Sequence, residues 1–390
     1  MKKIAKVLDG NAAVSEALRQ INPDVFGFYP ITPTSYIGEK YAKFVADGKV
    51  DTEFITAESE HAALSVCIGA AAAGGRAVTA TASQGLSLMN EVIYNAAGLR
   101  LPIVLINGNR VIGAPLSIHC AHDDAMSVRD SGWIQFFAKN PQEAYHLTIM
   151  SFKIAEAVKI PVMICMDCFH TTHTQMNMEI FTDEAVAQFI GKTVAALNLL
   201  DDKNPLTVGT FTKPDYYQEI KYQQYLDLKE SAKKIREIFA TFSTKFEIPS
   251  PKNAAKLVEV HSQTKAKTAV VVMGSMFEVV KEIQKKSTSL PFALIRPKVF
   301  RPFLSTEIRD ILSNFSKVLV MDRMSPSGAA FSPLGTEIAQ AFANSPTEPT
   351  IKNVIYGLGS RELNQIEFIS IIKNFDRLPS DQAEWISVRK

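Results

Sequence analysis

The 390-residue sequence lacks the glycine-rich motifs by which many enzymes hold phosphate groups. It contains no G-x-x-x-x-G-K-[ST] segment, which argues against a P-loop nucleotidase. No G-x-G-x-x-G segment follows a strand-like run, which argues against a nicotinamide dehydrogenase. A G-x-S-x-G segment, which presents the nucleophile of many α/β hydrolases, is also missing. These absences disfavour the commonest nucleotide-binding and hydrolytic classes.

Cysteine is scarce, with four residues: Cys67, Cys120, Cys165 and Cys168. Four are too few for a disulfide scaffold in a chain of this length. Cys165 and Cys168 form a C-x-x-C with His170 and His173 close behind, which leaves a redox pair or a metal site open. The usual zinc pattern places the histidines ~12–15 residues after the cysteines, so this spacing does not match it. We expect buried free thiols in a reducing compartment.

The sequence has neither an excess of charge nor a long apolar run. There are 42 basic and 40 acidic side chains, a net charge of +2, which gives no reason to expect a nucleic-acid or membrane partner. The uncharged stretch Ala62–Gly75 is too short to span a bilayer. Asp9 and Asn11 interrupt any apolar segment of a signal peptide. We therefore expect a soluble, cytoplasmic protein.

Apolar residues make up 46% of the chain, enough to bury a sizeable core, and its length suggests two domains. The stretch 213–245 is rich in charged residues and tyrosine, and regions of alternating strand-like and helical patterns lie on either side of it. We expect it to be a linking helix on the surface. The predicted domains are therefore 1–245, which includes this helical segment, and a smaller one at 246–390.

Both regions predict short strands followed by helices. The expected strands of the first region are 25–29, 54–55, 77–82, 102–107 and 161–167, and its expected helices are 34–45, 59–73, 86–97 and 141–158. The expected strands of the second are 269–273, 292–295, 318–321 and 354–356. This alternation predicts an α/β fold whose parallel sheet is covered on both faces. Ligands of such sheets bind beyond the carboxyl ends of the strands, so the segments after Tyr29, Thr56, Ala82 and Asn107 are the candidate site.

Two acidic residues and one long loop are prominent in the first region. Glu58 and Glu60 lie at the start of the helix expected over 59–73, where interaction with the helix dipole, worth ~0.3–1 kcal/mol, is the simplest explanation. The loop 108–132 carries two histidines, His119 and His122, and several charged residues. Long loops inside compact domains are usually functional or disordered. Because this loop also holds apolar residues and runs into Trp133, we expect it to be functional.

A recognisable pattern covers nearly the whole chain. In the first region it comprises Asp9–Asn11, Phe28–Thr34, Glu58–His61, Thr81–Gly85, Asn109–Arg110, Ala114–Leu116 and His122–Gln135. In the second it comprises Gly274–Met276, Arg296–Phe303, Leu319–Arg323 and Tyr356–Gly359. Together these segments resemble the alpha subunit of pyruvate:ferredoxin oxidoreductase (pyruvate synthase) and its 2-oxoacid:ferredoxin oxidoreductase relatives.

The resemblance implies both a fold and a reaction. The fold is a thiamine-diphosphate pyrimidine-binding-type domain with a parallel sheet, followed by a smaller transketolase C-terminal-like α/β domain. The reaction is the reversible oxidative decarboxylation of a 2-oxoacid on thiamine diphosphate, with pyruvate favoured. Coenzyme A takes the acyl group, and the electrons pass singly through iron–sulfur clusters to ferredoxin.

The resemblance also implies roles for individual residues. Glu60 matches the glutamate that hydrogen-bonds the thiamine pyrimidine ring and favours the imino tautomer, whose nitrogen acts as the base. Arg110 matches the arginine that binds the substrate carboxylate, for which a planar guanidinium is suited. Thr32 matches the threonine beside it, whose hydroxyl can donate to the substrate or to the developing oxyanion. Three neighbouring residues are expected against the cofactor: Tyr29, Pro30 and Ile31.

Two segments depart from the family pattern, and both concern the wall of the substrate pocket. Asp167-Cys168-Phe169 stands where Asp-Gly-Phe is frequent. Ser117-Ile-His-Cys-Ala-His122 stands where Asn-Ile-Trp-Asn-Asp-His is commoner. Branched-chain 2-oxoacids and 2-oxoglutarate are therefore alternative substrates, and a non-catalytic assembly subunit is an alternative of another class. The non-catalytic assembly subunit is disfavoured because Thr32, Glu60 and Arg110 are all present.

Gly-Asp-Gly, with which thiamine enzymes bind the diphosphate and its magnesium, is absent. An iron–sulfur cluster needs about four cysteine ligands, and these four cysteines have no ferredoxin-like spacing. We therefore expect no metal site on this chain. The resemblance implies a beta subunit that carries the diphosphate, Mg²⁺ and a [4Fe-4S] cluster. It further implies ferredoxin-like gamma and delta subunits, and ferredoxin or flavodoxin as the electron acceptor.

Overall fold

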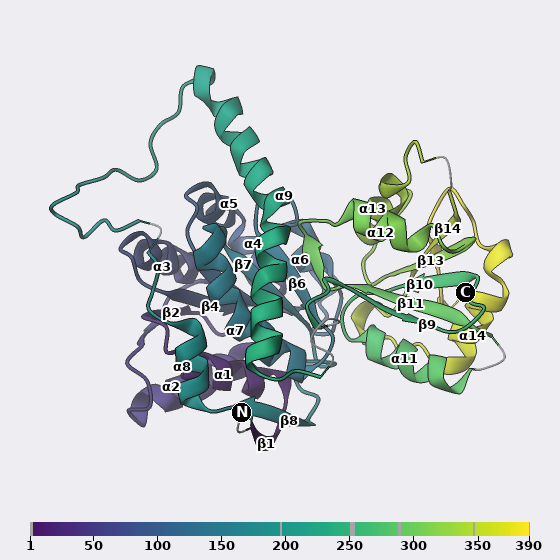
Figure 1. Cartoon of the computed structure of the whole chain (residues 1–390), viewed down its shortest axis with the longest axis horizontal. Coiled ribbons are helices and arrows are strands. Elements are labelled where there is room, and N and C mark those ends of the chain that lie inside the picture. The colour runs from purple at the N-terminus through teal and green to yellow at the C-terminus, as the bar shows by residue number, and fades with distance from the viewer. Residues whose placement is uncertain (1–2, 196, 250–253, 288–289, 346–347, 390) are drawn as a thin grey trace.

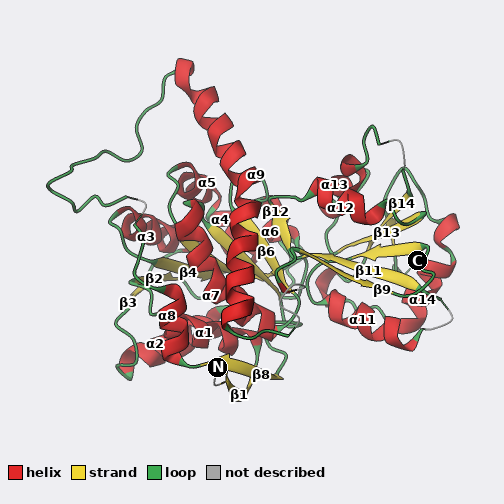
Figure 2. Ribbon diagram, viewed as in Figure 1, coloured by secondary structure: helices red, strands yellow, loops and turns green. Residues whose placement is uncertain are grey.

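The computed structural model describes the chain except residues 1–2, 196, 250–253, 288–289, 346–347 and 390. Two β-sheets lie side by side, each with helices on both faces (Figures 1 and 2). The predicted α/β fold is thus confirmed. Among the helices of the described residues, none is both long enough and apolar enough to cross a bilayer.

The first sheet has the strand order β12-β6-β7-β5-β4-β2-β3, and all neighbours except β12 and β6 run parallel. Its strands are β2 (Val25–Phe28), β3 (Glu53–Thr56), β4 (Ala77–Thr81), β5 (Ile103–Asn109), β6 (Ile134–Ala138), β7 (Val162–Asp167) and β12 (Val299–Arg301). A separate antiparallel pair joins β1 (Lys3–Leu8) to β8 (Met176–Phe181).

Apolar side chains cover both faces of this sheet because successive residues of a strand point to opposite sides. In β5, Val104 and Ile106 join one core, whereas Ile103 and Leu105 join the other. The first core is closed by α1 (Gly10–Ile21), α2 (Ser35–Ala46), α7 (Pro141–Val158), α8 (Asp183–Ile190) and α9 (Pro214–Lys245). The second is closed by α3 (Glu60–Ala72), α4 (Ser83–Leu88), α5 (Asn90–Gly98) and α6 (Asp123–Ser127).

The second sheet has the order β15-β14-β13-β10-β11-β9, with β9 antiparallel to β11 and the other neighbours parallel. Its strands are β9 (Val258–Ser262), β10 (Thr268–Val271), β11 (Phe292–Pro297), β13 (Lys317–Asp322), β14 (Thr350–Ile355) and β15 (Glu384–Trp385). Its faces are covered by α11 (Met276–Lys286) and α14 (Gln365–Lys373), and by α12 (Ser305–Leu312) and α13 (Pro333–Ala341). Two short 3₁₀ turns, Leu358–Ser360 and Phe375–Arg377, complete it.

The linking helix α9 is not confined to the surface, which corrects one prediction. Its N-terminal half is exposed and projects past the first sheet (Figure 1). Its C-terminal half is buried along one face, with Ile235, Phe239 and Phe242 at helical spacing in the same core as α7. The intervening lysines and glutamates hid this apolar stripe in the sequence, although positions i, i+4 and i+7 share one face of a helix.

Two predictions about the first sheet also need correction. The helix expected over 86–97 begins earlier, at Ser83, and is interrupted at Met89, so it forms α4 and α5. The loop expected over 108–132 begins after Asn109 and contains α6. The longest exposed part of this segment is therefore about 113–119, whereas 120–126 is mostly buried.

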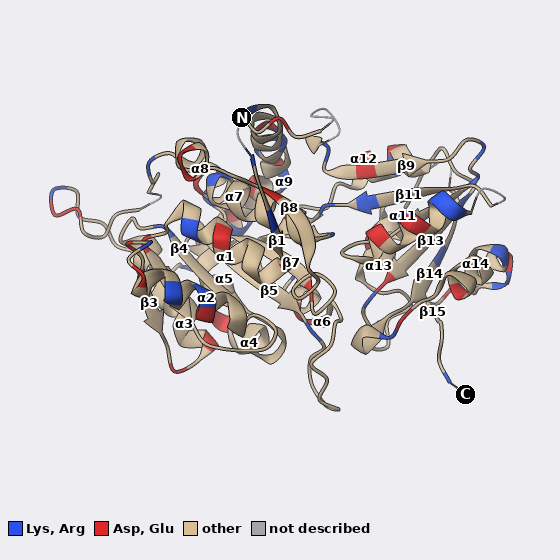
Figure 3. Cartoon of the chain, turned by 90° about the horizontal axis from the view of Figure 1, so that it is seen from below, with Lys and Arg blue, Asp and Glu red and all other residues tan. Residues whose placement is uncertain are grey.

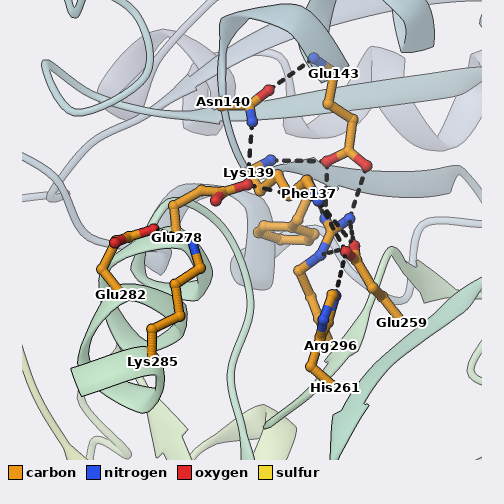
Figure 4. A network of polar contacts seen from close by, with 10 residues as sticks. All are labelled: Phe137, Lys139, Asn140, Glu143, Glu259, His261, Glu278, Glu282, Lys285 and Arg296. Atoms are coloured by element: carbon orange, nitrogen blue, oxygen red, sulfur yellow. Dashed lines mark hydrogen bonds and ion pairs between the residues drawn. The ribbon is translucent and has the colours of Figure 1, made fainter. Parts of the chain in front are cut away.

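A buried ion-pair network joins the two sheets near β9 and α7 (Figure 4). The guanidinium of Arg296, fully buried, donates to both carboxylate oxygens of Glu143 at 2.8 and 2.7 Å. It also donates to Glu259, which in turn accepts from Lys139. Such bidentate charged hydrogen bonds fix geometry as well as energy. Removing one partner would leave an uncompensated buried charge, at a cost of ~3–5 kcal/mol.

Candidate active site

The candidate site lies at the carboxyl edge of the first sheet, where β2, β4 and β5 end. Because these strands are neighbours and parallel, the segments that follow them meet at one edge. The helices α3, α4 and α6 all lie in the lower part of the view in Figure 3, below the labels of β4 and β5. A cleft of about 1720 Å³ opens elsewhere, between α9 and α12, and neither Glu60 nor Arg110 nor Thr32 lines it.

Glu60 is the first residue of α3 and is buried, with 6% of its surface exposed. Ser59 caps the helix by accepting from the backbone N–H of Ala62 at 3.1 Å, so the carboxylate of Glu60 is not needed as a cap. It forms no hydrogen bond or ion pair with any residue that the structure describes. A buried carboxylate without a partner is costly, and it is the kind of group that a bound ligand would satisfy.

The carboxylate of Glu60 lies against Gly85, which follows β4. A Cβ added at Gly85 would lie 2.5 Å from Glu60 Oε1 and 2.6 Å from Thr81 Oγ1, so a larger residue there would displace these side chains. The buried hydroxyl of Thr81 has no hydrogen-bond partner among the described residues. Glu58, two residues earlier, is exposed, so only the second of the two acidic residues points into the protein.

Arg110 follows β5 and is also 6% exposed. Its Nη1 donates to the carbonyl oxygen of Thr32 at 2.9 Å, and its Nε donates to that of Ser117 at 3.2 Å. These two carbonyls fix the plane of the guanidinium. Within the described chain no hydrogen bond engages its Nη2 group, which is thus available to an anion.

The segment Tyr29–Pro33 is the third part of the site. Tyr29 and Ile31 are half-buried, whereas Pro30 and Thr32 are exposed. The segment is held from below, because the side-chain amide of Asn11 donates to the carbonyl of Pro33 at 2.9 Å. The structure thus brings Thr32 and Arg110 into direct contact, and it places Glu60 at the same edge without a hydrogen bond to either.

Asp124 is a positioning residue that the sequence did not single out from the other charges of its loop. Its carboxylate is fully buried and accepts from the backbone N–H groups of Arg110, Ser83 and Ala125 at 3.1, 2.9 and 2.7 Å. Burial raises the pKa of Asp124 to about 6, although these hydrogen bonds oppose the shift. It joins the segments that follow β4 and β5, and so fixes where Arg110 leaves the sheet.

A second buried cluster lies at the end of β7, where Cys120, His122 and Asp167 have possible ligand atoms within 4.8 Å of one another. It is the only such group of three in the described residues. However, the guanidinium of Arg323 donates to both Asp167 (2.9 Å) and Cys120 (3.3 Å) and supplies the positive charge itself. Burial opposes ionisation of Asp167, but His122 and Arg323 outweigh it and hold its pKa well below the ordinary value. The cluster is therefore an ion-pair network in which Arg323 already provides the cation.

All four cysteines are buried and free, as expected from the sequence. Cys165 and Cys168 do not form a reactive pair, because burial raises the pKa of Cys168 to about 12 and that of Cys165 well above its ordinary value.

We expect that none of the four thiols of the folded chain reacts within minutes of adding a water-soluble disulfide reagent at pH 8. After unfolding in guanidinium all four should react, and four equivalents of the reagent's thiolate should be released. Rapid reaction of a thiol in the native protein would contradict the buried-thiol interpretation.

Comparison with known proteins places this architecture in a class. The fold resembles a 2-oxoglutarate:ferredoxin oxidoreductase from Magnetococcus marinus, with a TM-score of 0.70 at 18% identity over 95% of this chain and 65% of that one. It also resembles a split-gene transketolase, with a TM-score of 0.56 at 11% identity over 95% and 99% of the two chains. At these identities the likeness concerns the fold alone, and the chain spans about two thirds of the former protein's length.

The sequence comparisons are more specific. Residues 16–240 match the model of "Pyruvate flavodoxin/ferredoxin oxidoreductase, thiamine diP-bdg", and residues 266–368 match "Pyruvate:ferredoxin oxidoreductase core domain II". Pyruvate synthase subunit PorA of Thermotoga maritima is 40% identical over 91% of this chain and 90% of its own. The PorA subunit of Methanocaldococcus jannaschii is 37% identical over 99% and 98%. The ketoisovalerate oxidoreductase subunit VorA of Pyrococcus abyssi is 34% identical over 100% and 99%. The chain belongs to the pyruvate flavodoxin/ferredoxin oxidoreductase family, as a subunit of the alpha type.

Proposed function

We propose that this chain is the alpha subunit of a multi-subunit enzyme that oxidatively decarboxylates pyruvate. In the forward direction, pyruvate and coenzyme A give acetyl-CoA, carbon dioxide and one proton, and two electrons leave singly for two ferredoxin molecules. The observation that carries the proposal is that Arg110 contacts Thr32 directly, while the buried Glu60 lies beside Gly85, just after β4, at the same edge of the sheet. Family membership supports the same reaction.

Glu60 fits the pyrimidine ring of thiamine diphosphate. Its buried carboxylate lacks a partner in the described chain, and a protonated ring nitrogen would provide one. When bound, the cofactor supplies the carbanion that attacks the 2-oxoacid carbonyl. Glu60 would hold a proton shared with the ring nitrogen and so favour the imino form, while Tyr29, Pro30 and Ile31 would contact the ring. Its burial strengthens this hydrogen bond by excluding water.

Arg110 and Thr32 suit the substrate. The free Nη2 of Arg110 can donate to the carboxylate of a 2-oxoacid, while the carbonyls of Thr32 and Ser117 hold the rest of the guanidinium. The exposed Thr32 hydroxyl can donate to the oxygen on which negative charge develops. We favour pyruvate because three PorA relatives are 37–40% identical, against 34% for VorA. Branched-chain 2-oxoacids and 2-oxoglutarate are the alternatives.

The proposal assigns the remaining components to partner chains. In the described part of this chain, the one group of three candidate metal ligands is already neutralised by Arg323. We assign the diphosphate, Mg²⁺ and a [4Fe-4S] cluster to a beta subunit, and further clusters to ferredoxin-like gamma and delta subunits. Ferredoxin or flavodoxin would accept the electrons. Within this chain we assign residues 1–245 to the pyrimidine-binding domain and 246–390 to the transketolase C-terminal-like domain, with β12 crossing to the first sheet.

The direct test uses the complete enzyme. The native complex, purified through this chain, is supplied with coenzyme A and one 2-oxoacid at a time, and the reduction of a viologen dye is followed. We expect coenzyme-A-dependent reduction with pyruvate at a higher kcat/KM than with 2-oxoisovalerate or 2-oxoglutarate. A preference for either of the latter would reassign the substrate, and no turnover with any 2-oxoacid would favour an assembly subunit.

The isolated chain should be inactive. It should show no visible absorbance from iron–sulfur clusters and should bind thiamine diphosphate weakly, because the diphosphate and its magnesium carry much of the charge that drives binding. Calorimetric titration with the cofactor and Mg²⁺, before and after adding the beta subunit, measures this. Tight binding by the chain alone, or its reduction of a dye, would contradict the assignment of the diphosphate to a partner.

A further inference from the structure

The cluster at the end of β7 connects the two sheets through one carboxylate. Asp167, the last residue of β7, accepts at Oδ1 from His122 at 2.9 Å. Its Oδ2 accepts from Arg323 at 2.9 Å and from the backbone N–H and hydroxyl of Ser275 at 2.9 and 2.6 Å. Ser275 precedes α11 and Arg323 follows β13, so both belong to the second sheet's layer. The approach is close enough that a Cβ at Gly274 would lie 2.6 Å from Asp167 Oδ2.

The same layer holds the segment 117–122 by its backbone. The N–H of His122 donates to the carbonyl of Arg323 at 2.8 Å. The N–H of Cys120 donates to the hydroxyl of Ser360 at 3.1 Å, and the N–H of Ser360 returns a bond to the carbonyl of Cys120 at 3.3 Å. The exposed segment that begins after Arg110 is thus held at its C-terminal end by residues of the second sheet's layer.

That anchored segment reaches the arginine of the site. The carbonyl of Ser117 accepts from Arg110 Nε at 3.2 Å, and the N–H of Val111 donates to the carbonyl of His119 at 3.1 Å. The thiol of Cys168, one residue after Asp167, donates to the carbonyl of Ile118 at 3.0 Å. Movement of 117–122 would therefore change one of the two carbonyls that orient the guanidinium.

We propose that Asp167 is a positioning residue for the substrate: by fixing His122 and Arg323 it sets the segment 117–122, and through Ser117 it sets the orientation of Arg110. The inference rests on the proposed role of Arg110 as the carboxylate-binding group. Its physical basis is that the fully buried carboxylate accepts from His122, from the cationic Arg323 and twice from Ser275, so its partners are held in fixed positions relative to one another. The second domain thereby takes part in substrate binding without contacting the substrate.

The chain offers a matched control for this proposal. The network of Arg296, Glu143 and Glu259 is also buried and also joins the two layers, and none of its members lies in 110–122 (Figure 4). Breaking it with Glu143→Gln should weaken the junction of the layers but leave Ser117 and Arg110 in place. If Asp167 had a purely structural role, breaking either network should lower the unfolding temperature and leave kcat/KM for pyruvate nearly unchanged.

The experiment compares variants in the reconstituted complex with pyruvate. Asp167→Asn should lower kcat/KM for pyruvate by about 10- to 100-fold, since a displacement of ~1 Å at a site can cost ~10²-fold. Ser275→Ala, a milder change in case Asp167→Asn does not assemble, should lower it by about two- to tenfold. The KM for coenzyme A should stay unchanged in both. Glu143→Gln should lower the unfolding temperature while kcat/KM stays within about twofold.

A double-mutant cycle with Arg110→Ala decides the route of the effect. In the Arg110→Ala background, Asp167→Asn or Ser275→Ala should lower kcat/KM for pyruvate by less than about a further twofold. The reason is that the guanidinium whose orientation they set is absent. Suppose that Arg110→Ala lowers kcat/KM, but Asp167→Asn and Ser275→Ala either leave kcat/KM unchanged or lower it by the same factor with and without Arg110. The positioning proposal alone is then overturned. If Arg110→Ala is itself silent, the proposed carboxylate role fails, and the inference fails with it.

Discussion

Glu60→Gln should lower kcat of the complete enzyme by ~10²–10⁴-fold, the usual contribution of a group that moves a proton in the transition state. The amide keeps the shape of the side chain that packs against Gly85, so the subunits should still assemble. It cannot carry the negative charge that holds a proton on the ring nitrogen. The measurement is steady-state dye reduction with pyruvate at saturating coenzyme A and thiamine diphosphate.

Glu58→Gln is the matched control, because Glu58 is exposed and two residues away. The kcat of the Glu58→Gln enzyme should fall by less than about twofold, as expected for a charge that only interacts with the helix dipole. Equal losses in the two variants, or a Glu60→Gln enzyme near full rate, would return both residues to that structural role.

A second pair of variants tests the position of Glu60 without altering it. In Gly85→Ala the new methyl group would lie 2.5 Å from Glu60 Oε1, so the carboxylate must move. Gly69→Ala, within α3 itself, meets no atom within 4 Å. We expect Gly85→Ala to reproduce much of the Glu60→Gln defect, and Gly69→Ala to keep full activity.

The central strands of the first sheet could be predicted because each is a short apolar run with a clear boundary. Pro102 and Pro161 precede β5 and β7, and Gly74 and Gly75 separate α3 from β4. The strands β1, β6 and β8 were not predicted. β6, Ile-Gln-Phe-Phe-Ala, is buried on both faces, so its residues lack the alternation of apolar and polar side chains that marks a half-buried strand. β1 is mostly exposed and pairs antiparallel with β8, from Leu8 opposite Met176 to Lys3 opposite Phe181. Its partner strand is thus more than 160 residues away in the sequence, and the pairing depends on the fold.

The residues of the candidate site also fall into those that the sequence could predict and those that it could not. Glu60, Thr32 and Arg110 could be proposed from segments that resemble a family, and the contact between Thr32 and Arg110 joins two of them. Asp124 could not, since nothing local distinguishes it from Asp123 or the exposed Asp130. Its role follows from burial against backbone N–H groups of three segments. The partners of Asp167 are likewise distant in sequence, with Arg323 156 residues away, and only the assembled layers bring them together.

Arg110→Ala should lower kcat/KM for pyruvate by ~10–150-fold, because a hydrogen bond to a charged group is worth ~1.5–3 kcal/mol. The variant also releases the carbonyls of Thr32 and Ser117, which adds to the loss by loosening both segments. Arg129→Ala is the control, since Arg129 lies in the same loop but, among the described residues, pairs only with the exposed Asp130 and a backbone carbonyl. It should stay within about twofold of the unchanged enzyme.

Further substitutions at this position separate binding from catalysis. Arg110→Lys should recover only part of the loss, because an ammonium cannot hold two carbonyls and a carboxylate in one plane. Thr32→Ala should lower kcat more than it raises KM, if its hydroxyl meets the developing oxyanion. The measurements are steady-state kinetics with pyruvate and with 2-oxobutyrate, which share the carboxylate and differ by one methylene. If Arg110→Ala leaves kcat/KM within about twofold for both, a change below ~0.4 kcal/mol, the substrate carboxylate is held by other groups, and a partner chain becomes the place to seek them.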